Sequence, residues 1–359
     1  MNATSDPARP RDAAASAVVA VRAPAEVLPW TLPLLQQLFA SRASWPHAML
    51  FTGAAGTGKR SVAMHVAQAL LCESPRADGF ACAECPSCRY FAAGQHPDLR
   101  VLEPLKVDDD GDVKRVDSIQ VEKVRELREL VELTAHRGGN RVGLIVPAER
   151  MNIEAANALL KTLEEPPAGT YLLLVSHQPG RLLPTIVSRC RRIPVPVPAR
   201  AEAVRWLAAQ GVADAAGVLA QANGAPIAAL GLADPGAQAE RAAWLAALAE
   251  PRTLSPTLLS ARIDAGVREL RKDRLADAID WLIAWATDLA RVASGATPAA
   301  NIDHADVLAA LAPRVARISL SRYHRQLLRE RARISHPLTP RLTAEALLID
   351  YRALFDHGR

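Results

Sequence analysis

One segment of the sequence has the spacing of a phosphate-binding loop. Gly53-Ala-Ala-Gly56-Thr57-Gly58-Lys59 follows a short apolar run, precedes a helical pattern and matches G-x-x-x-x-G-K. In such loops the glycines let backbone N–H groups surround phosphates, the lysine neutralises them, and the next helix adds its N-terminal dipole. These five named residues are the predicted nucleotide-binding set. The alternative is a glycine-rich strand–helix turn with no ligand.

The residues that would hold Mg²⁺ beside this loop are replaced. Arg60 stands where a Ser or Thr hydroxyl binds the metal, and Ser61 comes one residue late, about 100° around a helix. A P-loop ATPase also needs a carboxylate at the end of a buried strand, but the expected strand ends in Val146-Pro147. Glu149 is interpreted as a solvated loop or helix-start residue. The sequence predicts no competent magnesium site, and leaves weak binding of ATP or ADP open.

Four cysteines follow the loop and its helix closely. They have the spacing Cys72-x9-Cys82-x2-Cys85-x2-Cys88. Four thiolates this close suit tetrahedral zinc, and a site made only of protein ligands is structural rather than catalytic. A redox pair or incidental buried thiols are the alternatives, but the segment is an insertion rich in turn residues. Cys190 stands apart and is interpreted as a small buried hydrophobe.

The elements that must position these residues alternate between strands and helices. Short apolar runs predict buried strands, and apolar residues at helical spacing predict helices, in the following segments: strands at 48–51, 141–146 and 171–175, helices at 59–71, 117–131 and 155–163. Asp117 and Gln120 form an expected capping box for the middle helix. This alternation predicts a parallel α/β sheet up to about residue 195.

The remaining chain predicts further domains. A flexible leader is expected at 1–25, the α/β domain with its cysteine insertion (72–88) at 26–197, a small helical domain at 198–235 and a larger one at 236–359. The acidic run at 108–112 is interpreted as a solvated hairpin turn. Apolar runs fall short of the ~20 residues of a membrane helix, and the N-terminus lacks a signal-peptide pattern. The protein is therefore expected to be cytoplasmic, with no membrane partner.

Composition excludes little by itself. The 359 residues include 43 Lys plus Arg and 38 Asp plus Glu, giving a net charge of +5 that is spread along the chain. Aromatic residues make up 4%, which argues against a surface of stacked rings for single-stranded nucleic acid. A zinc-containing nucleic-acid-binding protein is the weaker functional alternative on these grounds.

Several motifs in order resemble the clamp-loader family of AAA+ proteins. They are Pro29-Trp30, the loop at 53–59, the four cysteines, Gly94-Gln-His-Pro-Asp98, NALLKTLEEPP at 157–167 and Ser188-Arg189-Cys190, with weaker matches at 223–226 and 340–342. The resemblance runs from about residue 28 to the end. It implies an α/β P-loop (AAA+) nucleotide-binding domain, followed by a small helical lid and an all-α collar that joins five subunits into an open ring.

The resemblance also implies a role and partners. In this family the arginine of the Ser-Arg-Cys triplet, here Arg189, reaches toward the ATP of a neighbouring subunit as an arginine finger. The alternative is a structural or surface arginine. The partners implied are the gamma/tau and delta subunits, the beta sliding clamp indirectly, and primed DNA through the assembled ring.

The same resemblance distinguishes two kinds of subunit. The gamma/tau pattern has an arginine in the lid that senses the γ-phosphate, and the matching residue here is Ile227. Together with Arg60, Val146 and Pro147, this replacement predicts a chain with no catalytic activity of its own. An ATP-hydrolysing subunit of the gamma/tau type is the alternative.

Overall fold

The structure is a computed structural model, and its described residues are 26–107, 113–137, 139–265, 270–334 and 339–356. The chain divides into two compact units, Met1–Val197 and Pro198–Arg359. The predicted leader at 1–25 and the acidic run at 108–112 lie outside the described residues.

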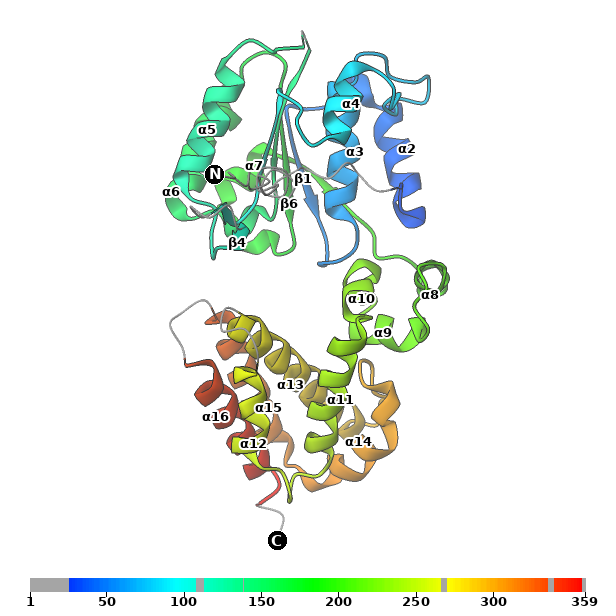
Figure 1. The fold of residues 1–359 in the computed structure, drawn as a ribbon, viewed down its shortest axis with the longest axis vertical. Helices are drawn as coiled ribbons and strands as arrows, with labels where there is room; N and C mark the ends of the chain where they lie inside the picture. The colour runs from blue at the N-terminus through cyan, green and yellow to red at the C-terminus, as the bar shows by residue number, and fades with distance from the viewer. Residues whose placement is uncertain (1–25, 108–112, 138, 266–269, 335–338, 357–359) are drawn as a thin grey trace, which may run out of the picture. The chain divides into compact units, whose positions relative to one another are not determined.

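A parallel five-stranded sheet forms the centre of the first unit (Figure 1). Its order is β2-β5-β6-β1-β7, and all neighbouring pairs are parallel. The strands of the unit are β1 (Ala48–Thr52), β2 (Leu99–Leu102), β5 (Arg141–Ile145), β6 (Thr170–Ser176) and β7 (Arg191–Pro194), with a separate antiparallel pair, β3 (Leu105–Val107) and β4 (Val113–Arg115). The predicted parallel α/β sheet is confirmed.

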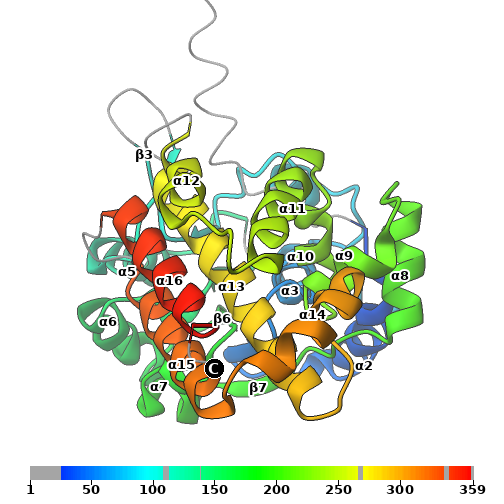
Figure 2. The same ribbon diagram turned by 90° about the horizontal axis from the view of Figure 1, so that it is seen from below.

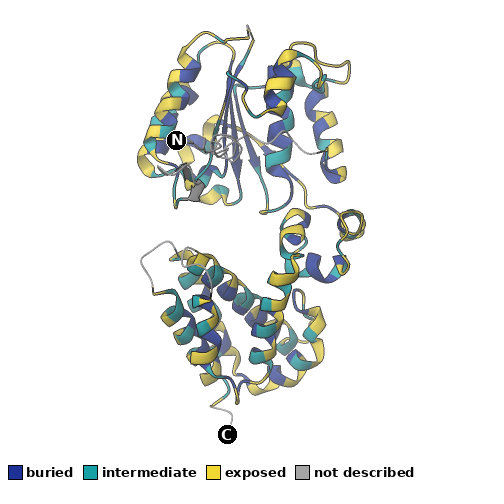
Figure 3. Cartoon of the chain, in the orientation of Figure 1, coloured by how far each residue is buried: buried dark blue, intermediate teal, exposed yellow. Residues whose placement is uncertain are grey.

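Helices cover both faces of this sheet, which explains why its central strands β1, β5 and β6 are buried along almost their whole length. The helices are α2 (Leu32–Ala40), α3 (Lys59–Leu71), α4 (Pro86–Ala92), α5 (Val121–Glu132), α6 (Ile153–Glu164) and α7 (Pro184–Arg189). Alternate residues of β1 face opposite sides: Phe51 packs with α2 and α3, and Leu50 packs with α5 and α6. Figure 3 shows the strands buried between the two helical layers.

The second unit is helical throughout its described residues. Its helices are α8 (Arg200–Ala209), α9 (Ala215–Gln221), α10 (Pro226–Leu232), α11 (Pro235–Ala249), α12 (Pro256–Ser260), α13 (Arg271–Ala293), α14 (Ala305–Leu311), α15 (Arg317–Ala332) and α16 (Pro340–Ala353). A small apolar cluster joins α8 to α10, and a larger one surrounds α13, which contacts α11, α14, α15 and α16 (Figure 2). These two clusters are compatible with the predicted division near residue 235, where α11 begins.

The predicted capping box is wrong. Gln120 is itself the N-cap of α5, and no side chain caps that end of the helix. The reason is an isolated parallel bridge between Ile119 and Met151, which holds the residues before α5 in an extended conformation. Among the described helices, none is long and apolar enough by itself to cross a bilayer. The bent pair Ala215–Gln221 and Pro226–Leu232 passes that test together, on length and composition only.

Candidate functional site

The glycine-rich loop connects β1 to α3, as the sequence predicts. Gly58 has φ +98° at the N-cap of α3, and a Cβ there would lie 2.5 Å from Leu28 Cδ1. Gly53 has φ +145°, and a Cβ there would lie 2.8 Å from the Val195 carbonyl oxygen. Both positions therefore require glycine for backbone shape and close approach. The indole of Trp30 donates to the Thr57 carbonyl at 2.8 Å and fixes the loop from outside.

Lys59 is folded back onto the loop that it belongs to. Its side chain is 2% exposed, and its ammonium donates to the carbonyl of Ala54. Burial lowers the pKa of Lys59 from its ordinary value to about 8, and the nearby Glu149 carboxylate opposes that shift. The lysine thus has the position and charge expected of a phosphate ligand, at the cost of a buried cation.

The positions expected to hold Mg²⁺ offer no ligand in the first unit. Arg60 turns to Glu103, which follows β2, and the two side chains pair at 3.2 Å. Val146 is buried at the end of β5, and Pro147 follows it. A guanidinium and two apolar side chains bring no oxygen to a metal at these three positions.

Glu149 has a role that the sequence analysis missed. It lies in the 3₁₀ turn Ala148–Arg150, but it is half-buried rather than fully solvated. Its Oε1 accepts hydrogen bonds from the backbone N–H groups of His177, at 2.9 Å, and Gln178, at 3.2 Å. The carboxylate therefore holds the end of β6 and also lies near enough to Lys59 to influence its pKa.

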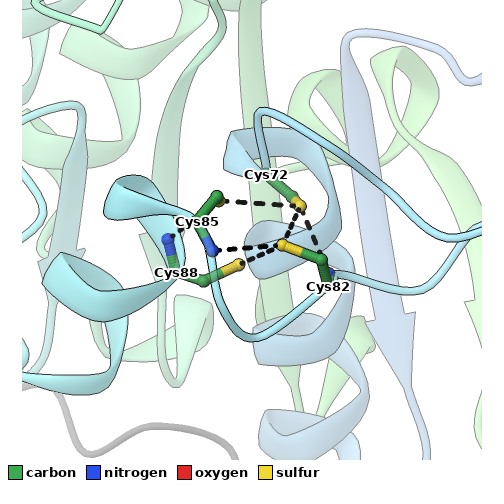
Figure 4. A group of neighbouring side chains, drawn as sticks. All are labelled: Cys72, Cys82, Cys85 and Cys88. Carbon is green, nitrogen blue, oxygen red and sulfur yellow. Dashed lines mark hydrogen bonds between the residues drawn. The ribbon is translucent and has the colours of Figure 1, made fainter.

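The four predicted zinc ligands converge on one point. Cys72 is the C-cap of α3, Cys82 lies in the following loop, Cys85 is the N-cap of α4, and Cys88 lies in the first turn of α4 (Figure 4). Their sulfur atoms lie within 4.8 Å of one another, with separations of 3.5, 3.9 and 4.0 Å for three pairs. A tetrahedral zinc ion with bonds of about 2.3 Å needs sulfur–sulfur edges of about 3.8 Å. The donor set fits zinc in number, type and size.

Backbone N–H groups support thiolates at this cluster. Glu84 and Cys85 donate to Cys82 Sγ at 3.5 and 3.3 Å, and Cys88 donates to Cys85 Sγ at 3.4 Å. These donors lower the pKa of Cys82 to about 6, whereas burial raises the pKa of Cys88. A bound cation would offset the cost of burying several thiolates together. All five cysteines are free of disulfides, and none of these sulfur pairs is at bonding distance.

Arg189 and the glycine-rich loop lie at opposite ends of the parallel strands. The loop follows the carboxyl end of β1, whereas Arg189 ends α7 just before β7, which is parallel to β1. Because Arg191 is level with Met49, Arg189 and the loop are separated by a strand length on the order of 10 Å or more. Arg189 therefore lies away from the glycine-rich loop of its own chain.

Two local groups hold the Arg189 guanidinium. It forms an ion pair with Glu164 at 2.6 Å and donates to the Thr185 carbonyl at 3.0 Å. Its side chain is 36% exposed, so part of the planar fork is available to another molecule. The neighbouring Cys190 is buried, which raises the pKa of its thiol to about 11 and fits its expected role as a small apolar residue.

Comparison with known proteins assigns the family. The family model described as DNA polymerase III, delta subunit, matches residues 31–198. The DNA polymerase III subunit delta' of Escherichia coli is 32% identical over 289 residues, which cover 79% of this chain and 82% of that protein. The chain belongs to the DNA polymerase III subunit delta' family.

Other members of the delta' family give the same result. The Pseudomonas aeruginosa protein is 45% identical over 225 residues, 61% of this chain and 65% of that protein, and the Yersinia pestis protein is 35% identical over 70% of this chain and 72% of its own length.

A DNA polymerase III gamma subunit-related protein of Thermotoga maritima matches in structure with a TM-score of 0.43 at 17% identity, covering 89% of this chain and 99% of that one.

In this delta' family member, the Gly94-Gln-His-Pro-Asp98 motif has a structural role. Asp98 is 1% exposed and accepts hydrogen bonds from the backbone N–H groups of His136, at 2.7 Å, and Arg137, at 3.0 Å. Arg137 also pairs with Glu73 at 2.8 Å, beside the first zinc-ligand candidate. The motif thus attaches the cysteine insertion to the loop after α5.

The sequence analysis missed the acidic partners of its own predicted residues. Glu103, Glu149 and Glu164 contact Arg60, the end of β6 and Arg189 respectively. Glu164 stands within the quoted 157–167 motif, which is the one signal that could have indicated it. Ile227, at the position of the missing lid arginine, lies in the first turn of α10 and is 39% exposed.

Proposed function

We propose that this chain is a non-hydrolysing delta' subunit of a DNA polymerase III clamp loader. The observation that carries the proposal is that Arg189 and the glycine-rich loop lie at opposite ends of neighbouring parallel strands. An arginine placed there can supply charge to the ATP of a neighbour, but not to its own loop. The replaced magnesium ligands at Arg60, Val146 and Pro147 support the absence of hydrolysis by this chain.

In this proposal Arg189 acts as an arginine finger in trans. Its planar guanidinium would stabilise the charge that spreads over the γ-phosphoryl group during hydrolysis by the neighbour. The proposed partners are the gamma/tau and delta subunits, with the beta sliding clamp and primed DNA reached through the ring, in the cytoplasm. The helices of residues 198–235 and 236–359 would serve as lid and collar.

We further propose that Cys72, Cys82, Cys85 and Cys88 hold one structural zinc ion. The matching sulfur separations and the four protein ligands support a closed site. When bound, zinc would supply a cross-link between the end of α3 and the start of α4. The loop at Gly53, Gly56, Thr57, Gly58 and Lys59 is proposed as a vestigial or weak nucleotide site.

The deciding experiment reconstitutes the ring with unmodified motor subunits and varies only this chain. Arg189→Ala should depress the DNA- and clamp-stimulated ATPase, because fingers in trans contribute ~10³–10⁵ in rate at the site they serve. Arg189→Lys should restore it only in part, since an ammonium lacks the planar fork. The exposed Arg192 is the matched control, and Arg192→Ala should retain full activity. Unchanged stimulated ATPase and clamp loading with Arg189→Ala would show that Arg189 is structural.

The isolated chain provides a second test. Its ATPase should not exceed background, since Arg60 and Val146 replace the hydroxyl and the strand-end carboxylate expected to hold Mg²⁺. A turnover near the ~1 s⁻¹ of modest enzymes would instead support the gamma/tau-type alternative, provided that Lys59→Ala abolishes it.

A further inference from the structure

Four arginines share one face of α15. Arg322, Arg325, Arg329 and Arg333 are spaced by three, four and four residues, and Arg333 is the C-cap of the helix. At 3.6 residues per turn they lie within an arc of about 80°. Their Cα atoms rise about 16 Å along the axis, with successive steps of about 4.5–6 Å.

This arginine face points away from the core of the second unit. Leu320, Tyr323 and Leu327 are buried on the other side of α15, in the apolar cluster around α13 and α16. All four arginines are exposed. The packing of α15 therefore leaves its arginines to the solvent.

The four arginines have no acidic partner among the ion pairs of the described residues, in contrast with other arginines of the unit. Arg331, on a different side of α15, pairs with Asp280 at 2.7 Å, and Arg262 pairs with Glu240 at 2.5 Å. Like charges three or four residues apart destabilise a helix by ~0.2–0.5 kcal/mol per pair. The face thus carries a cost in stability that no contact within the described chain offsets.

We propose that this arginine face binds the phosphodiester backbone of a nucleic-acid duplex. Guanidinium groups in a row recognise successive phosphates, and the exposed face carries no aromatic side chain on which unpaired bases could stack. The partner is therefore the backbone of a duplex rather than a single strand, without sequence preference. This contact belongs to the second unit of this chain itself and does not depend on Arg189 or on the proposed ATP site.

The test uses the full-length chain and a fluorescein-labelled DNA duplex of about 30 base pairs. Anisotropy titrations between about 50 and 200 mM salt give the affinity and its salt dependence. The triple variant R322Q/R325Q/R329Q should bind at least about tenfold more weakly at the lowest salt, and its log–log salt slope should fall by about 3. R322K/R325K/R329K should retain most of the affinity, because phosphates accept a point charge.

A matched control removes the same charge elsewhere in the second unit. Arg200, Arg205 and Arg252 are exposed, and R200Q/R205Q/R252Q should leave affinity and slope within about twofold of the parent. Equal losses in both triple variants would mean that net charge alone is measured, and would overturn the proposal. Unchanged DNA binding in the α15 variant, together with lost assembly on gamma/tau and delta, would identify an interface with an acidic protein surface instead, and would also overturn it.

Discussion

The glycine-rich loop and the cysteine cluster lie at the two ends of α3. They differ in whether the backbone or the side chains have the arrangement expected of a binding site. The loop retains its backbone shape, with Gly58 against Leu28 and Trp30 donating to Thr57, although Arg60 has turned to Glu103. The four cysteines of the cluster converge, and their sulfur separations suit a metal. The difference shows that the loop is held by its backbone shape, whereas the cluster is defined by side chains that meet at one point.

Loss of one cysteine should have the largest effect on stability. Cys85→Ser should abolish the one zinc per chain and lower the free energy of unfolding by several kcal/mol, since structural zinc contributes ~10–16 kcal/mol in small peptides. Metal analysis and thermal unfolding measure both. Cys190→Ala is the control outside the cluster and should keep the zinc. Parent protein purified under reducing conditions with almost no metal would contradict the zinc site and remove the contrast with the loop.

Removing the buried carboxylate that anchors the insertion should have the next largest effect. Asp98→Ala removes the buried carboxylate that accepts hydrogen bonds from the backbone N–H groups of His136 and Arg137. The free energy of unfolding should fall by about 3 kcal/mol in chemical denaturation. Asp306→Ala, at an exposed position in α14, should change it by less than about 0.5 kcal/mol. Equal effects of the two variants would exclude an anchoring role.

Replacing the loop lysine should stabilise the protein. Lys59→Met removes a buried cation, so the free energy of unfolding at pH 7 should rise by about 1–3 kcal/mol. Below pH 8 the lysine is charged in both the folded and unfolded states, and the full difference is present. As pH rises from about 8 to 10.5, the folded protein loses its proton first and the difference disappears. A destabilised Lys59→Met variant would show that the ammonium supports the loop.

The smallest effect is expected at the ion pair beside the proposed finger. Glu164→Gln removes the pair with Arg189, but both side chains are more than a third exposed, and such pairs contribute ~0–1 kcal/mol. Thermal unfolding should therefore barely change, as with Glu165→Gln, its exposed neighbour. A loss of several kcal/mol would mean that Arg189 is held as a structural residue and is not free to reach another subunit.

Local patterns predicted much of this molecule, and long-range contacts limited the rest. The strands at 48–51, 141–146 and 171–175 and the convergence of four cysteines follow from periodicity and spacing, which act over a few residues. The failed capping box at Asp117 depended on a bridge from Ile119 to Met151, 32 residues apart in sequence and invisible to local propensity. The partners of Arg60 and Arg189 were missed for the same reason, because tertiary packing alone brings Glu103 and Glu164 to them.

The parallel sheet gives this chain a direction. Arg189 lies at the amino end of the strands and the glycine-rich loop at their carboxyl end, which makes these two surfaces unlike. If the proposed roles hold, subunits that match the arginine of one chain to the loop of the next would associate head to tail and not as symmetric pairs. In the proposed assembly, a chain with a working donor and no working acceptor belongs at one end of such a series. The order of the subunits would then depend on whether each chain has a functional arginine at one end of its strands, a functional phosphate-binding loop at the other end, or both.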